Sequence, residues 1–411
     1  MIRRPASIAA LALAAHAMLA GCTSARSGSM DSASGPAAEC ATAEARLSFD
    51  FEGASPARCV IEGPRAFALV IAPEHAPPIN PSPWYAFRYE AEPGEPVRVR
   101  LDYLGAEHRY VPKLLQGEVL SFPSVVVAQD PRSAQIELPP GTGTVSAQPL
   151  LGAAYYDAFL RRLVAASGGE RIELGRSLDG APIMAARFGR ADAPHLVTIL
   201  GRQHPPELTG SHALEPFLET LVQRLAQDPA LAAKVQILAV PLLNPDGVAR
   251  GHWRANRGGV DLNRDWGPFS QPETRAVRDW LAREVPGTTP LAMLDFHSTG
   301  RNLFYVQGDE ANAAGKAFLA QWLGGKEQAV EGYPFEIAPR NANPGSGTSK
   351  NWFFECFAIP AYTYEVGDDT DPAATARAAR QLAADLVPAL MTLAAAPQDA
   401  ASAQTPGCLR G

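Results

Sequence analysis

The chain has 411 residues and a mass of 43.7 kDa, which is enough for two domains with substantial hydrophobic cores. Hydrophobic residues at 46% and charged residues at 19% are typical of a globular protein. A formal net charge of −7 gives no basic surface for nucleic acid, so no nucleic-acid partner is expected, and no apolar run after residue 25 is long enough to span a membrane.

Residues 1–21 are predicted to be a signal peptide, because two arginines precede the short apolar run IAALALAAHAMLA. The run ends in LAGC, which resembles the lipobox of bacterial lipoproteins, where cleavage leaves the cysteine, here Cys22, as an acylated first residue. The alternative is a plain secretory signal with an incidental cysteine. Residues 22–39 are then a lipidated tether, and we expect an exported lipoprotein anchored to a membrane through Cys22 and facing the periplasm. Thr23, in place of an aspartate, favours the outer membrane.

The other four cysteines indicate disulfide bonds if the protein is exported to an oxidising compartment. They are Cys40, Cys59, Cys356 and Cys408. Three pairings are possible, and the pairs nearest in sequence are Cys40–Cys59 and Cys356–Cys408. We predict that Cys40–Cys59 is a disulfide within the first domain, with free buried thiols as the alternative.

Residues 40–150 are predicted to form a small β-sandwich. Short β-prone runs such as AFALVIAP, WYAFRYEAE and VRVRLDYLG are separated by Gly, Pro, Asn and Asp. No helical stretch longer than about ten residues stands out among them, which favours an all-β domain.

Residues 151–397 are predicted to be an α/β domain with a mixed central sheet flanked by helices, followed by a C-terminal tail at 398–411. The apolar runs HLVTIL, VQILAVPLL, LAMLDFHS and AYTYEV alternate with amphipathic segments such as LTGSHALEPFLETLVQRLAQ. Alternation of strands and helices is typical of an α/β sheet.

Three chemically active stretches follow predicted strands of this domain. They are HPPE (204–207), DFHSTG with His297, and YEVGDD with Glu365. A His-x-x-acid pair alone is weak, since about one such pair is expected by chance in this composition. Ligands of open α/β sheets bind beyond the carboxyl ends of the strands, where these stretches would meet. A catalytic zinc takes three nitrogen or oxygen ligands and one open position, so we predict one zinc per chain, bound by His204, Glu207 and His297.

Glu365 is the remaining acidic residue of the predicted site. A carboxylate beside a zinc-activated water can accept a proton and return it to the leaving amine. The residues before it, PAYTY, are mostly apolar and would place Glu365 in a partly desolvated position where its pKa can shift. The alternatives are a salt-bridged structural glutamate for Glu365 and a core histidine for His297.

The motifs HPPE, NPDG, HWR, VDLNRDW, DFHS and YEVGD occur in this order and resemble the zinc carboxypeptidase family over most of residues 170–390. The resemblance implies that Arg254 stabilises the oxyanion, that Asn263 and Arg264 bind the terminal carboxylate of a peptide, and that Glu365 is the general base and acid. Planar guanidinium groups suit both arginine roles.

The chain departs from the family pattern at two positions. Pro206 stands where many members have arginine before the glutamate of the zinc motif, and the place of the mobile tyrosine of the digestive members falls near Asn343. The stretch GTSKNW matches the family's pocket for the departing side chain, which puts Lys350 at a specificity position. Lys350 could pair with an acidic C-terminal residue or point to solvent.

NPSPWYAFRYEAEPGEPVRVRLDYLG is similar to the β-sandwich that precedes the catalytic domain in cytosolic carboxypeptidases. We therefore expect a zinc metallocarboxypeptidase that hydrolyses the C-terminal bond of peptides with a free carboxylate, outside the cytoplasm. The alternatives are an amidase of cell-wall peptides with the same zinc centre and a non-catalytic peptide-binding lipoprotein.

Overall fold

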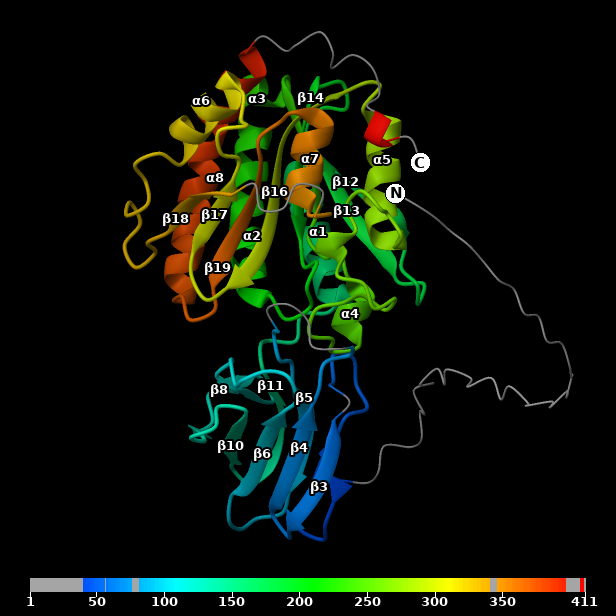
Figure 1. The fold of residues 1–411 in the computed structure, drawn as a ribbon, viewed down its shortest axis with the longest axis vertical. Helices are drawn as coiled ribbons and strands as arrows, with labels where there is room; N and C mark the ends of the chain where they lie inside the picture. Colours follow the sequence, from blue (N-terminus) through cyan, green and yellow to red (C-terminus); the bar gives the residue numbers. More distant parts are fainter. Residues whose placement is uncertain (1–39, 56, 76–80, 341–345, 397–406, 410–411) are drawn as a thin grey trace, which may run out of the picture. The chain divides into compact units, whose positions relative to one another are not determined.

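The computed structural model describes residues 40–55, 57–75, 81–340, 346–396 and 407–409. The predicted signal peptide and tether lie outside these residues, and so does Asn343. Figure 1 shows a β-sandwich followed by a helix-flanked mixed sheet, which confirms the predicted fold class. The exact domain boundaries stay a prediction.

The β-sandwich contains two sheets, with strand orders β1-β2-β5-β11-β7-β8 and β3-β4-β6-β10-β9. Neighbouring strands are antiparallel except β4 and β6, which are parallel. Alternate residues of the strands face inward, as the period-2 pattern predicts: in β6, Val97, Val99, Leu101 and Tyr103 are buried. The strands are β1 (Cys40–Ala41), β2 (Ala45–Ser48), β3 (Arg58–Gly63), β4 (Ala66–Ile71), β5 (Ala86–Ala91), β6 (Val97–Tyr103), β7 (Lys113–Gln116), β8 (Val119–Ser121), β9 (Val125–Val127), β10 (Ser133–Leu138) and β11 (Gly141–Ser146).

The second sheet has eight strands in the order β12-β13-β15-β14-β16-β19-β17-β18. Its centre is parallel from β15 through β14 and β16 to β19, and antiparallel pairs flank this centre. The strands are β12 (Glu170–Arg176), β13 (Pro182–Phe188), β14 (His195–Gly201), β15 (Val235–Val240), β16 (Thr289–Thr299), β17 (Leu303–Val306), β18 (Glu336–Pro339) and β19 (Ala361–Gly367).

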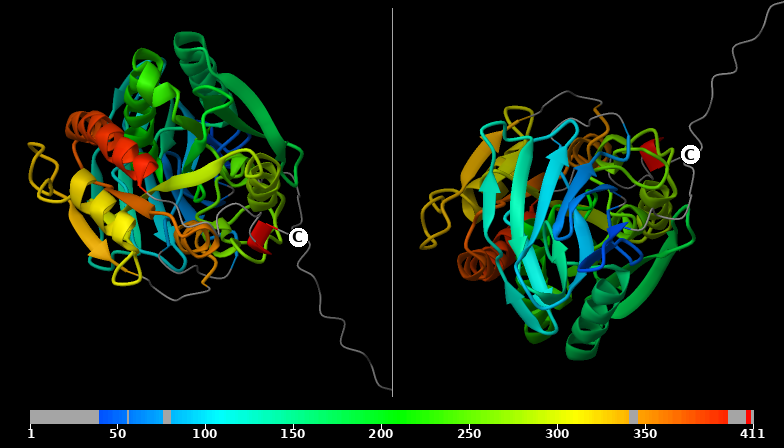
Figure 2. Two further views of the ribbon diagram at one scale, coloured as in Figure 1. Left: turned by 90° about the horizontal axis from the view of Figure 1, so that it is seen from above. Right: turned by 90° about the horizontal axis from the view of Figure 1, so that it is seen from below.

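Helices cover both faces of this sheet (Figures 1 and 2). Alternate residues of β14 divide between the faces: Val197 and Ile199 pack with α1, α2, α6 and α8, whereas Leu196 and Leu200 pack with α5 and α7. The helices are α1 (Ala153–Ser167), α2 (Leu208–Gln227), α3 (Pro229–Ala232), α4 (Pro245–Ala249), α5 (Pro272–Glu284), α6 (Ala313–Trp322), α7 (Ser349–Phe357) and α8 (Pro372–Ala395), with the 3-10 turns η1 (Leu262–Arg264) and η3 (Gly407–Leu409).

Each of two disulfides joins two different elements of the fold. Cys40–Cys59 connects β1 of one sandwich sheet to β3 of the other, which confirms the predicted pair. Cys356–Cys408 connects α7 to the C-terminal turn η3, where Leu409 is buried in the core. The two pairs nearest in sequence are therefore the ones that form.

The strongest periodic segments were predicted well. The predicted helix LTGSHALEPFLETLVQRLAQ is α2, residue for residue, and the four predicted strands are β14, β15, β16 and β19. The strands β12, β13, β17 and β18 were missed. They lie toward the two edges of the sheet, and β17 and β18 have only four residues each, which is too short for a clear period.

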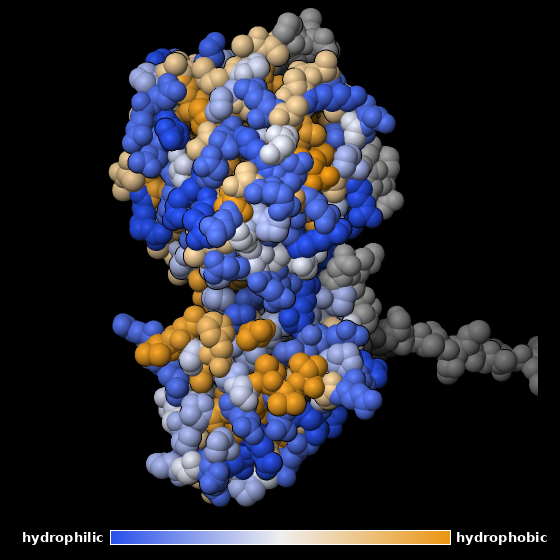
Figure 3. Space-filling model, turned by 90° about the vertical axis from the view of Figure 1, so that its left-hand side faces the viewer, coloured by the Kyte–Doolittle hydropathy of each residue, from blue (hydrophilic) through white to orange (hydrophobic). Residues whose placement is uncertain are grey.

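Exposed apolar side chains gather on the sandwich, as the orange atoms in Figure 3 show. Val119, Phe122 and Val126 are 64–68% exposed on or beside the edge strands β8 and β9. In the described part of the chain, none of the helices has both the length and the apolar character needed to span a membrane.

Candidate active site

The start of α2 is held against the ends of β16 and β19. The Gly210 N–H donates to Ser298 Oγ (2.8 Å) and Thr209 Oγ1 donates to the Val366 carbonyl (3.1 Å). A Cβ on Gly210 would lie 2.6 Å from the His297 carbonyl oxygen, so only glycine permits this approach. The contact brings Glu207, the residue before α2, next to His297 of β16.

The parallel register completes the arrangement. His297 and Glu365 are direct Cα partners on β16 and β19, and the end of the neighbouring strand β14 leads into the loop that carries His204. The three predicted stretches therefore meet at one edge of the sheet, as their positions at strand ends indicate.

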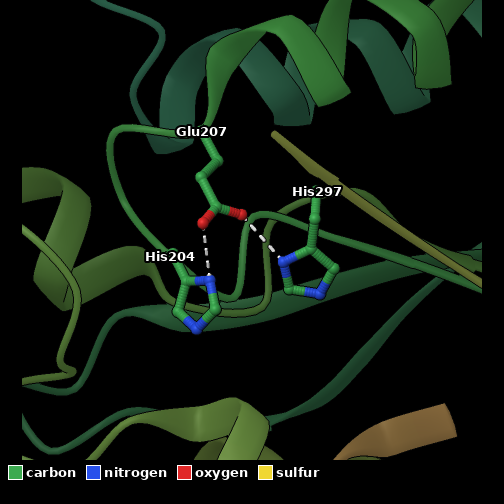
Figure 4. Close-up of side chains that lie close together, drawn as sticks. All are labelled: His204, Glu207 and His297. Atoms are coloured by element: carbon green, nitrogen blue, oxygen red, sulfur yellow. Dashed lines mark hydrogen bonds and ion pairs between the residues drawn. The ribbon is translucent and has the colours of Figure 1, made fainter. Parts of the chain in front are cut away.

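His204, Glu207 and His297 form a compact set of potential metal ligands (Figure 4). Their ligand atoms lie within 4.8 Å of one another. His204 Nδ1 is 2.8 Å from Glu207 Oε1, and His297 Nδ1 is 2.8 Å from Glu207 Oε2. All three side chains are buried, so the site has the nitrogen and oxygen donors that zinc prefers.

Two aspartates that the sequence analysis missed lie behind the imidazoles. His204 Nε2 is 2.8 Å from Asp261 Oδ1, and His297 Nε2 is 2.8 Å from Asp295 Oδ2. Carboxylates commonly hold the second nitrogen of a metal-bound histidine, which orients the ring and fixes its tautomer. The available signal was the Asp in VDLNRDW and in DFHS, within the quoted motifs.

The local charges favour ionised groups at this site. Burial alone would lower the pKa of His297, but Asp295 and Glu207 outweigh it and hold that pKa well above its usual value. Burial would likewise raise the pKa of Glu207, but the facing His204 and His297 hold it well below its usual range. Glu207 is therefore a carboxylate, the form that can bind a metal, whereas a metal that binds His297 must displace its proton.

Glu365 lines the same cavity as His204, Glu207 and His297, but its pKa shifts in the opposite direction to that of Glu207. The residue is half-buried, but its Oε2 is shielded from solvent and has no hydrogen-bond partner among the described residues. Burial raises the pKa of Glu365 to about 7, with Glu207 adding to the shift and His297 opposing it. A carboxyl group with a pKa near neutrality can both accept and release a proton.

A cavity of about 280 Å³ brings all eight predicted site residues together. Several arginine and lysine side chains line it. Two of its lining residues, Ser82 and Arg109, come from the β-sandwich. Tyr305 and Arg340 also line it, with the Arg340 guanidinium 5.7 Å from the Tyr305 ring centre. The predicted residues in its wall are His204, Glu207, Arg254, Asn263, Arg264, His297, Lys350 and Glu365.

Hydrogen bonds to nearby groups hold Arg254 and the η1 residues Asn263 and Arg264. Arg254 Nε donates to Asp261 Oδ2 (2.6 Å), which leaves the terminal nitrogens of the fork as donors for a substrate. Asn263 Oδ1 accepts from the Ser349 N–H (2.9 Å), and its Nδ2 is 3.3 Å from His297 Nε2. Arg264 is exposed and donates to the Asn263 carbonyl.

Lys350 lies in the first turn of α7 and is only 6% exposed, so it does not point to bulk solvent. Burial lowers the pKa of Lys350 to about 8, although Glu310 and Glu355 partly oppose the shift. Lys350 is one of the residues that line the cavity.

The comparisons with known proteins agree with this geometry. The zinc carboxypeptidase family profile matches residues 156–384. Among curated proteins, the chain is 30% identical over 168 residues to an uncharacterized protein of Zymomonas mobilis, covering 37% of this chain and 44% of that protein. It is 32% identical over 127 residues to cytosolic carboxypeptidase 2 of Danio rerio, covering 30% of this chain and 18% of that protein. The chain thus spans less than half the length of these relatives.

Solved structures share the fold over a longer stretch. A metallo-carboxypeptidase from Burkholderia cenocepacia has a TM-score of 0.69 at 17% identity, covering 85% of this chain and 98% of that one. A metallo-carboxypeptidase from Pseudomonas aeruginosa, in complex with (2-guanidinoethylmercapto)succinic acid, has a TM-score of 0.64 at 20% identity, covering 85% and 100%. Identities this low show the fold alone. Since the family match itself extends over more than half of the sequence, the chain belongs to the zinc carboxypeptidase family.

Proposed function

We propose that this protein is a zinc-dependent carboxypeptidase that removes the C-terminal residue of peptides outside the cytoplasm, with Glu365 as general base and acid. One observation carries the proposal. The same 280 Å³ cavity is lined by the candidate zinc ligands, by Glu365 for proton transfer, and by cationic side chains that can bind a carboxylate. A pocket with a few convergent polar groups and a shifted pKa is the expected form of a hydrolytic site.

The chain's own residues divide the chemistry among them. His204, Glu207 and His297 would hold the zinc, which when bound polarises a carbonyl and lowers the pKa of water. Glu365 would accept the proton of the attacking water and pass it to the leaving amine nitrogen. Arg254 would donate to the substrate carbonyl oxygen as negative charge develops there. Arg264, with Asn263 beside it, would bind the terminal carboxylate and set the register of cleavage.

Two observations support export. Residues 1–22 have the pattern of a lipoprotein signal, and the disulfides Cys40–Cys59 and Cys356–Cys408 are of the kind that persists in oxidising compartments. We therefore propose a lipoprotein anchored at Cys22 and facing the periplasm.

The purified protein is expected to release single C-terminal residues from a library of linear peptides. A chelator should abolish release, and added Zn²⁺ should restore it, because the metal site supplies the chemistry. Peptides with an amidated C-terminus should be poor substrates, since Arg264 then has no carboxylate to bind. Equal cleavage of amidated peptides, or cleavage only at γ-glutamyl or D-residue links, would instead support the cell-wall amidase.

We further propose that Lys350 selects substrates with C-terminal Glu or Asp. A buried ammonium pairs with a carboxylate more strongly than an exposed one does. Lys350→Ala should lower kcat/KM for C-terminal Glu by about tenfold, or about 1.4 kcal/mol, and leave C-terminal Leu nearly unchanged. Lys316→Ala, at an exposed lysine of α6 that donates to the Asp309 carbonyl, is the matched control.

The same proposal has a pH dependence. Because the lowered pKa of Lys350 is about 8, its ammonium form is present below that pH and is lost above it. The ratio of kcat/KM for Glu over Leu should therefore fall as the pH rises through about 8, since kcat/KM reports the free enzyme. Arg254, Arg264, Arg340 and Glu365 also line the cavity, and any effect of their titration applies to both substrates. Faster release of Leu than of Glu at pH 7 would remove Lys350 as the selector.

A further inference from the structure

A carboxylate of the β-sandwich binds three consecutive backbone N–H groups of the catalytic region. Glu74 follows β4, and its Oε2 accepts from Trp253 N (2.7 Å), while its Oε1 accepts from Arg254 N (3.0 Å) and Ala255 N (2.6 Å). Successive N–H groups of this kind form a concave site for an anion, and hydrogen bonds to a charged acceptor are stronger than neutral ones. The contact is therefore a strong local constraint on the backbone at residues 253–255.

That backbone carries a residue of the proposed mechanism. Arg254 reaches the cavity wall from it, and its Nε donates to Asp261 Oδ2, whose partner oxygen Oδ1 lies 2.8 Å from His204 Nε2. The segment between α4 and η1 contains no helix or strand, so no regular ladder fixes its position. Glu74 thus supplies the backbone hydrogen bonds that secondary structure supplies elsewhere.

Neighbouring contacts hold the same segment from the sandwich side. Trp253 is 1% exposed and packs into the hydrophobic core of the sandwich. Gly251 (φ +63°) lies so close to the sandwich that a Cβ there would be 2.5 Å from the Ala54 carbonyl oxygen. His75, next to Glu74, lies against Gly259 (φ +76°), where a Cβ would be 2.6 Å from His75 Nε2. The segment that carries Arg254 therefore packs closely against the sandwich along much of its length.

We propose that Glu74 is a positioning residue for hydrolysis: its carboxylate fixes the backbone of residues 253–255 so that Arg254 can stabilise the negative charge on the substrate carbonyl oxygen. The inference rests on the role proposed for Arg254. A charge stabiliser acts only if it is already aimed where the charge develops, so loss of its backbone support lowers kcat more than it affects KM. The β-sandwich thereby contributes to catalysis, because its Glu74 positions Arg254.

The test compares Glu74→Gln, Glu74→Ala, Arg254→Ala and the double variant Glu74→Ala/Arg254→Ala in the full-length protein. Glu74→Gln keeps the shape but turns one acceptor oxygen into a donor facing an N–H. Glu74→Ala should lower kcat by about 10- to 100-fold with KM within about threefold, as expected for a misplaced catalytic group. Glu74→Gln should give a smaller loss, and both should keep full zinc content.

The double variant separates positioning from general stability. If Glu74 acts through Arg254, Glu74→Ala has no further effect on kcat in the Arg254→Ala background. Glu44→Ala is the control, because Glu44 pairs with Arg65 within the sandwich (2.7 Å), lies outside the cavity and should leave kcat unchanged. For Glu74→Gln, an unchanged melting temperature with a lowered kcat supports positioning.

Three results separate the possible failures. Unchanged kcat in Glu74→Ala, with Arg254→Ala strongly impaired, overturns the inference and leaves the role of Arg254 intact. Additive losses in the double variant also overturn it, because Glu74 then acts independently of Arg254. Unchanged kcat in Arg254→Ala overturns the oxyanion role itself, and the positioning role with it.

Discussion

Glu365→Gln is expected to fold, to keep its zinc and to lose about 100- to 10,000-fold in kcat, the range typical of general acid–base groups. Glutamine has nearly the same shape, but its amide cannot accept and release a proton at neutral pH. Zinc should stay bound because Glu365 is not one of the three grouped ligand residues. The measurements are kcat on a C-terminal peptide substrate and the metal content of the purified variant.

Glu273→Gln is the matched control for this experiment. Glu273 is fully buried, burial raises its pKa to about 7, and its Oε1 has no hydrogen-bond partner among the described residues, as for Glu365 Oε2. It receives a hydrogen bond from Asn256 and does not line the cavity. The control should keep kcat within a few-fold. Near-normal turnover of Glu365→Gln would remove Glu365 from the mechanism.

His297→Ala is expected to lose most of its zinc. Loss of an outer carboxylate partner of a metal-bound histidine typically costs about 10- to 100-fold in metal affinity, and loss of the ligand itself should cost more. The change also removes His297 as a partner of the buried Glu207 and Asp295, so a lower melting temperature should accompany the loss. Elemental analysis after gel filtration gives the zinc content per chain, expected to be one in the wild type.

His212→Ala is the control for the metal experiment. His212 is a half-buried histidine of α2 that lies outside the ligand group, so its variant should keep one zinc per chain. Full zinc retention in His297→Ala would show that His297 is not a ligand.

Much of the fold and the grouping of the candidate metal ligands could be predicted from the sequence, because both depend on neighbouring residues. The apolar spacing of Leu208–Gln227 predicted α2, and strand runs ending in HPPE, DFHS and YEVGD indicated that three strand ends meet. His204 and Glu207 are three residues apart, so a single turn brings them together, and the parallel register pairs His297 with Glu365. Periodicity and position at a strand end are local properties that can be recognised in the sequence of a single segment.

Other features were decided only by the tertiary structure. Asp261 and Asp295 hold the two imidazoles, Lys350 faces the cavity, and Glu74 of the sandwich holds the backbone of Arg254. Glu273 and Glu365 have similarly raised pKa values, and only their positions separate a buried glutamate of the fold from one in the cavity. These outcomes depend on contacts between residues far apart in sequence. Such contacts arise when sheets and loops pack together and exclude water, and packing then decides which polar groups meet and how strongly their charges interact.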